Sequence, residues 1–112
     1  MVKGFVANRI KREAMSLTQT DFAKLVGTSS ATISTYENGY EISESTVKCI
    51  RYTIKDLESK MTEEELGPYK LRVACEMAIA EPDDEMRKEK LRSVMFSALT
   101  WQDKIDKKKR GF

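Results

Sequence analysis

The side chains most often used in catalysis and metal binding are scarce in this chain. Its 112 residues include no histidine and only two cysteines, Cys49 and Cys75, which lie too far apart for a CxxC motif. The absence of histidine excludes Ser/His and Cys/His nucleophile pairs and most zinc sites. Because the chain also lacks a glycine-rich phosphate loop and a paired catalytic constellation, we expect no enzyme activity, no cofactor and no metal. Cys49 is expected to be a small buried side chain rather than a redox sensor.

A second group of polar side chains is more informative, because its hydroxyl-bearing residues gather on a short predicted helix. Capping and stop signals predict one helix over 19–26, with Thr18 as N-cap and Gly27 at its end, and another over 30–37. Ile33 and Tyr36 lie three residues apart and define the buried side of the second helix. The opposite side carries only small or polar residues, namely Ser30, Ala31, Ser34 and Thr35. This division is typical of a helix that enters the major groove of DNA.

The stretch from 9 to 50 resembles the lambda-repressor-like helix-turn-helix family, also called Xre or Cro-type regulators. The residues that carry the resemblance are Gln19, Ala23, Gly27, Ile33, the ending Tyr36-Glu37-Asn38-Gly39, and then Ser43, Val47 and Ile50. The chain departs from the family pattern near Ile42, where a proline is usual, so the path of the following loop is left open.

The resemblance implies specific roles for the residues that match the family motif. Those matching Ser30, Ala31 and Thr35 face base edges, and Ser34 shares their side of the helix. Those matching Gln19 and Asn38 contact phosphates, and the pair matching Arg12 and Glu37 joins the first helix to the third. We expect further phosphate contacts from Thr28 and Ser29 in the turn and from Lys3 and Arg9 near the N-terminus, although Lys3 and Arg9 also fit ordinary surface charges.

The elements that must position these residues are all predicted to be α-helical, since apolar residues recur at helical spacing throughout. We expect a first helix over 4–15 and a fourth from Ser43 to about Lys60. The apolar residues of the fourth form a heptad seam. Thr62 to Gly67 predicts a short turn, and Pro68 is expected to open a separate fifth helix that ends near Ala80. A last helix is expected to begin near residues 83–85. The predicted organisation is a helix-turn-helix domain over 1–61 and a helical region over 62–112.

The charge distribution separates these two regions. Residues 1–61 carry nine basic and seven acidic side chains, whereas residues 62–103 carry six basic and ten acidic ones, so only the first region can offer phosphates a favourable surface. The basic run Lys107–Arg110 at the end fits a solvated tail or a nucleic-acid arm.

The helices after residue 61 exceed what a DNA-binding domain needs. They fit either an extended intramolecular core or a homodimer interface, for which the expected residues are Leu91, Val94, Met95, Ala98 and Leu99. We therefore expect a cytoplasmic, sequence-specific transcriptional regulator that binds double-stranded DNA as a homodimer and acts as a repressor of a prokaryote, phage or mobile element. The alternative is an antitoxin or adaptor whose C-terminal helices hold a protein partner. No membrane span is expected.

Overall fold

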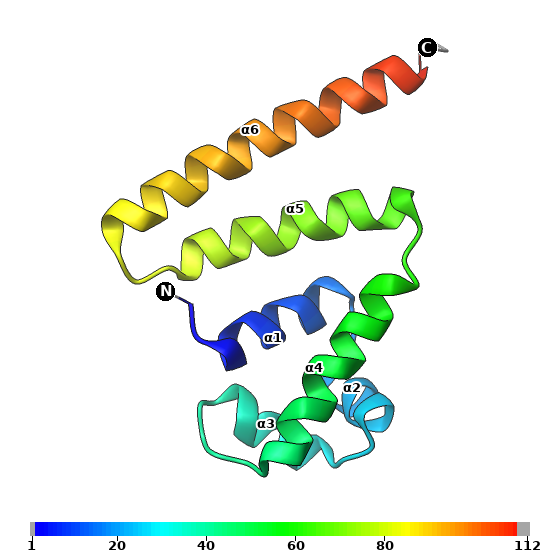
Figure 1. Cartoon of the computed structure of the whole chain (residues 1–112), viewed down its shortest axis with the longest axis vertical. Helices are drawn as coiled ribbons and strands as arrows, with labels where there is room; N and C mark the ends of the chain where they lie inside the picture. Colours follow the sequence, from blue (N-terminus) through cyan, green and yellow to red (C-terminus); the bar gives the residue numbers. More distant parts are fainter. Residues whose placement is uncertain (1, 110–112) are drawn as a thin grey trace.

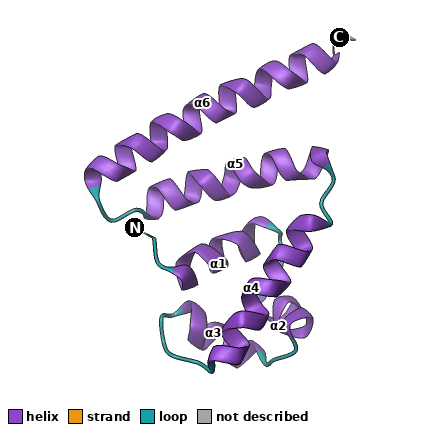
Figure 2. Ribbon diagram, in the orientation of Figure 1, coloured by secondary structure: helices purple, strands orange, loops and turns teal. Residues whose placement is uncertain are grey.

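The computed structural model describes the backbone of residues 2–109 and the side chains of residues 2–99, and this part of the chain is all-helical (Figures 1 and 2). Its elements are α1 (Gly4–Ala14), α2 (Gln19–Val26), α3 (Ser30–Glu37), α4 (Glu44–Ser59), α5 (Glu63–Ala80) and α6 (Asp84–Lys109). The expected all-α class is confirmed. The basic run at 107–110, for which a tail or an arm was expected, has its side chains outside the described residues.

The bounds of α2 and α3 agree with the sequence prediction because local signals set both of them. Thr18 caps α2 by accepting a 3.0 Å hydrogen bond from the backbone N–H of Asp21, and Ser29 caps α3 by accepting one of 3.2 Å from Thr32. Gly27 ends α2 in the left-handed conformation, with φ of 89°. These three residues therefore fix the turn between the two helices.

The core lies where α2, α3 and α4 meet, and α1 closes it. Ala23 is buried where the helices approach one another, as its small side chain predicts. Ile50 and Ile54, from the heptad seam of α4, are also buried in this cluster. The seam therefore packs within the chain rather than against another one. The cluster consists of Phe22, Ala23, Ile33, Tyr36, Ile50 and Ile54.

The expected break between a short turn at 62–67 and a helix beginning at Pro68 is wrong, because α5 runs unbroken from Glu63 to Ala80 through Pro68. Proline at this position removes the N–H that would bond to the carbonyl of residue 64, and its ring crowds that carbonyl, yet the helix continues through it. A capping box at Thr62 and Glu65 supplies hydrogen-bond acceptors for backbone N–H groups at the start of the helix. Tyr69, buried and hydrogen-bonded to Glu58 of α4 at 2.9 Å, holds the next turn against the domain.

The C-terminal helices add two layers to the domain (Figure 1): α5 lies beside α1, and α6 folds back over α5 and diverges from it towards the C-terminus. The extents of the molecule, 49 × 34 × 18 Å, reflect this spread. The loop between α4 and α5 spans residues 60–62, next to the predicted boundary at 61. Within the described residues, no helix is both long and apolar enough to cross a bilayer.

The expectation of a buried Cys49 is wrong, since its side chain is exposed while that of Cys75 is half-buried. Cys49 directly precedes the buried Ile50 on α4, and adjacent residues of an α-helix point about 100° apart. Its side chain therefore lies on the flank of α4, outside the core.

Candidate nucleic-acid interface

The third helix has two chemically different sides. Ile33, Tyr36 and Glu37 are buried against the rest of the domain. Of the four residues predicted to contact base edges, Ser30, Ala31 and Thr35 are exposed and Ser34 is half-buried. The structure therefore brings these four together on the solvent-facing side of α3, as a shallow surface of two methyl groups and three hydroxyls.

Some of the hydrogen-bonding groups on this surface already bond to α3 itself. Thr35 Oγ1 donates a 2.8 Å hydrogen bond to the carbonyl of Ala31, so its proton is occupied while its oxygen lone pairs and methyl group remain available. Asn38 Nδ2 lies 3.5 Å from Ser34 Oγ, at the outer limit of a hydrogen bond. The surface thus presents two methyl groups and hydroxyl oxygens that can accept, while the hydroxyl protons of Ser30 and Ser34 remain available to donate.

The residues predicted to contact phosphates bracket α3 at both ends. Thr28 and Ser29 precede its first turn, and Ser29 is engaged as the N-cap. Gln19 Nε2 donates a 3.0 Å hydrogen bond to Glu37 Oε1, which brings the start of α2 to the end of α3, where the exposed Asn38 lies. Polar groups at the two ends of a helix that lies in a DNA groove can contact the phosphate backbones on either side of that groove.

Lys3 and Arg9 are exposed on and before α1, but the structure does not join them to this surface. Lys3 is the N-cap of α1, and its side chain makes no capping hydrogen bond. Among the described side chains, neither residue forms an ion pair or a hydrogen bond with α2 or α3.

Arg12 and Glu37 form a buried, bidentate ion pair. Arg12 Nε and Nη2 donate hydrogen bonds of 2.7 Å and 2.8 Å to the two oxygens of Glu37, and Arg12 Nη1 donates one of 2.6 Å to the carbonyl of Leu17. The two residues are only 7% and 6% exposed, and no described buried side-chain nitrogen or oxygen lacks a partner. The network therefore fixes α1, α2 and α3 relative to one another.

One contact behind α3 did not emerge from the sequence. Asn8 Nδ2 donates a 2.7 Å hydrogen bond to the hydroxyl of Tyr36, which the sequence identified only as an apolar anchor. Asn8 lies four residues before Arg12, so both point from the same side of α1 toward α3. That spacing is the signal by which Asn8 could be identified as a residue facing α3.

Two short helices joined at a left-handed glycine, the second of them presenting a polar side to solvent, define a helix-turn-helix domain. In agreement, residues 9–48 match the family model described as Helix-turn-helix. This segment, from α1 into α4, belongs to the lambda-repressor-like helix-turn-helix family of DNA-binding regulators, while α5 and α6 lie outside the match. Comparisons with curated proteins and with solved structures found no match.

Proposed function

We propose that this protein is a sequence-specific transcriptional repressor of a prokaryote, phage or mobile element that inserts α3 into the major groove. The observation that carries the proposal is the two-sided character of α3. Its base-facing candidates Ser30, Ala31, Ser34 and Thr35 lie together and open to solvent, whereas Glu37 on the other side is locked to α1. A rigidly held helix whose outer side chains are small can approach base edges closely.

Phosphate contacts are assigned to both ends of α3. Gln19 and Asn38 serve one end, Thr28 and Ser29 serve the other, and Lys3 and Arg9 supply charge near α1. Such contacts set the register of the protein on the duplex without selecting sequence. We expect duplex binding to weaken steeply as salt rises, because each neutralised phosphate releases counterions.

The outer side of α3 makes a single domain a weak discriminator of sequence. Residues 30–35 contain no Arg, Lys, Asn or Gln, the side chains whose bidentate contacts contribute about 1–3 kcal/mol of base discrimination each. Methyl contacts from Ala31 and Thr35 to thymine are the main direct selection that remains. Useful specificity can then come from two half-sites, from an arm over Lys3 to Arg9, or from DNA shape. We propose two half-sites about 34 Å apart, bound by a homodimer.

The surface assigned to dimerisation lies on α6. Leu91, Met95 and Leu99 are 37%, 67% and 70% exposed and are spaced four residues apart, so they form one apolar stripe. Val94 and Ala98, the other expected interface residues, are half-buried, and Val94 borders a cavity shared with α5. In this proposal Leu91, Met95 and Leu99 contact the second copy. Val94 and Ala98 instead pack between α6 and α5 of the same chain.

The second candidate function is that of an antitoxin or adaptor whose C-terminal helices hold another protein. It is favoured by the cavity of about 320 Å³ between α5 and α6, where Val73, Met77 and Val94 offer an apolar lining. Methionine-lined surfaces adapt readily to different partners. A stoichiometric protein partner that co-purifies and occupies this cavity would favour the second candidate over the first.

Selection of random duplexes with the purified full chain, combined with light scattering, tests the proposed function. We expect a palindromic site, a dimeric mass, and loss of both when Met95 and Leu99 are changed to Asp. Lys88→Asp and Arg92→Asp, also exposed on α6, are the matched controls and should leave the mass unchanged. Failure to enrich any sequence would contradict the proposed function.

A further inference from the structure

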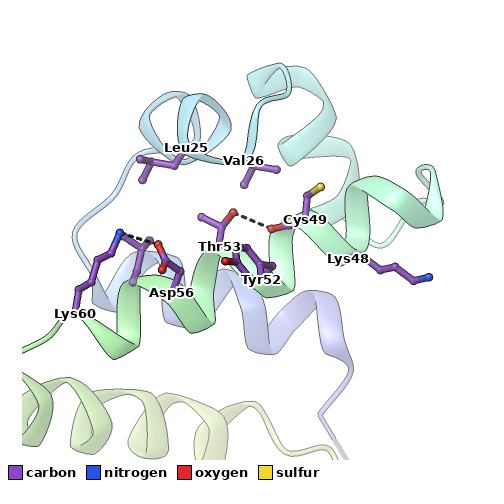
Figure 3. Close-up of a pocket in the computed structure, with 9 residues that line it drawn as sticks. Leu25, Val26, Lys48, Cys49, Tyr52, Thr53, Asp56 and Lys60 are labelled. Atoms are coloured by element: carbon purple, nitrogen blue, oxygen red, sulfur yellow. Dashed lines mark hydrogen bonds and ion pairs between the residues drawn. The ribbon is translucent and has the colours of Figure 1, made fainter.

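A groove with a volume of about 440 Å³ runs between α2 and α4 (Figure 3). Leu25 and Val26 of α2 point toward α4 from one wall, and Tyr52 and Thr53 of α4 stand on the other. None of the residues assigned above to DNA or to the α6 stripe lines it. It is therefore a surface that the proposed function leaves unused.

The groove exposes apolar surface on both of its walls. Leu25 is 53% exposed and Tyr52 is 72% exposed, while Val26 and Leu57 at the base are half-buried. Single exposed apolar residues are common on protein surfaces, but apolar side chains that converge on one concave site mark a contact with another molecule. The free thiol of Cys49 opens into the same space.

A stripe of exposed cations runs along α4 beside the groove, and Lys48 is the member that lines it. Lys48, Arg51 and Lys55 are all exposed, and with Tyr52 they follow the spacing i, i+3, i+4 and i+7, which places them in one stripe. Tyr52 lies at the edge of this stripe nearest the groove, on the side of α4 away from the buried Ile50 and Ile54.

These cations differ from the other charges of the groove in lacking a counterion. Lys60 donates a 2.8 Å hydrogen bond to Asp56 across one end of the groove (Figure 3), and so these two charges compensate each other. In contrast, no described side chain forms an ion pair with Lys48, Arg51 or Lys55. The stripe therefore carries three uncompensated positive charges beside an apolar groove.

We propose that this groove and the adjoining cationic stripe bind an acidic amphipathic helix of a partner protein. Apolar side chains of the partner would enter between Leu25 and Tyr52, and its carboxylates would face Lys48 and Lys55. The stripe extends over about 10 Å, or two helical turns, which matches the apolar face of a short helix. An apolar groove with complementary charge along its border is the usual geometry for docking a helix.

Two designed peptides of about 16 residues test the charge and the apolar part of the proposal separately. Both carry leucines at i, i+3, i+4 and i+7, with glutamates beside the leucines in one peptide and lysines in the other. By fluorescence anisotropy with the full chain, we expect the acidic peptide to bind saturably and the basic peptide to bind at least about tenfold more weakly. Amide shifts in nuclear magnetic resonance spectra should concentrate on the second half of α2 and on α4.

Matched variants locate the site. Lys48→Glu combined with Lys55→Glu should invert the preference in favour of the basic peptide, and Leu25→Ser with Tyr52→Ser should weaken the acidic peptide at least about tenfold. Lys88→Glu combined with Arg92→Glu, which makes the same charge change on α6, should leave peptide binding within about twofold. Leu25, Lys48 and Tyr52 line the groove, and Lys55 lies on the same stripe of α4 as Lys48. All of the substituted side chains are exposed, so urea unfolding should confirm that the variants remain folded.

The thiol of Cys49 supplies an independent block of the groove. In a Cys75→Ser background, coupling fluorescein maleimide to Cys49 should abolish binding of the acidic peptide, whereas Cys49→Ala should bind normally. Unchanged binding by the blocked protein overturns the proposal. So does a charge reversal that lowers duplex affinity or dissociates a dimer while peptide binding is retained, since the stripe would then serve DNA or a second copy. Duplex selection by the unmodified chain is read separately, so failure of the peptide leaves the DNA-binding proposal standing.

Discussion

Gln19 Nε2 donates a 3.0 Å hydrogen bond to Glu37 Oε1, the same oxygen that accepts from Arg12 Nη2 at 2.8 Å. The residue assigned to a phosphate is therefore oriented by the buried ion pair behind it. One amide hydrogen and the carbonyl oxygen of Gln19 remain available for other contacts. The position of the proposed DNA contact and the stability of the domain thus depend on the same carboxylate.

Removing one partner of the Arg12–Glu37 pair should lower the free energy of unfolding far more than replacing both partners. Arg12→Met leaves the Glu37 carboxylate buried without its main counterion, and we expect a loss of about 3–5 kcal/mol in the free energy of unfolding. Arg12→Met combined with Glu37→Leu should recover most of that loss, because neither charge is then buried. Urea unfolding monitored by circular dichroism measures both. A single variant within 1 kcal/mol of the parent would show that the pair contributes little.

Substitutions at the ends of α3 should act differently from those on its outer side. Gln19→Ala and Asn38→Ala should each lower affinity about tenfold on every duplex tested, because phosphate contacts carry no sequence information. Thr35→Ala, which removes both a methyl group and an oxygen, should instead change the preferred base at one position of the site. Thr35→Val, which keeps the methyl group and replaces the hydroxyl by a second methyl, is the matched control.

Affinities measured on the selected site and on scrambled duplexes separate these two effects. A Gln19→Ala variant that loses affinity only on the selected site would contradict a phosphate role. A Thr35→Ala variant whose loss is equal on all duplexes would contradict a role in base contact.

The sequence predicted α2 and α3 to the residue because their ends are set by local features. Thr18 and Ser29 satisfy backbone N–H groups within three residues, and Gly27 permits the left-handed turn, so each boundary is decided by its neighbours. The outer and inner sides of α3 followed equally well from helical spacing, since Ile33 and Tyr36 are the apolar members of the helix.

Features that depend on tertiary contacts were not predictable in this way. The start of α5 was misplaced because Pro68 favours a first turn locally, whereas the buried Tyr69 and the capping box at Thr62 keep the helix continuous. The spacing of Asn8 and Arg12 could place Asn8 on the side of α1 that faces α3, but its bond to Tyr36, 28 positions away, requires the packing of α1 on α3. Helical spacing alone did not place Cys49 outside the core, because a cysteine suits either environment.

Alanine substitutions at the two left-handed glycines should destabilise the domain by different amounts. Gly27 and Gly39 both have φ of 89°, which costs an L-residue about 1–2 kcal/mol. A Cβ on Gly27 would meet nothing within 4 Å, so Gly27→Ala should cost only this backbone strain, and Gly27→Asn less. A Cβ on Gly39 would lie 3.1 Å from Phe5 Cζ, so Gly39→Ala should cost more. Equal losses in urea unfolding would contradict this distinction.

Acid should weaken the junction between α5 and α6 through Glu81. This residue is 1% exposed, and its hydrogen bond from Lys90, 2.5 Å long, lowers the pKa of its carboxyl from the usual 4.5 to about 2. Between these two values the unfolded chain binds a proton that the folded one does not. The stabilisation is therefore complete above pH 4.5 and is lost as the pH falls toward 2.

Urea unfolding at pH 7, 4.5 and 3 measures this contribution of Glu81. Stability should decline over that range in the parent chain, and Glu81→Gln should be less stable at pH 7 and decline less steeply toward pH 3. Glu85→Gln is the matched control, because that carboxylate is exposed and lies 3.9 Å from Lys88, too far for a strong hydrogen bond. If Glu81→Gln and Glu85→Gln gave the same pH profile, the acid sensitivity of the protein would have to arise from carboxyl groups elsewhere in the fold.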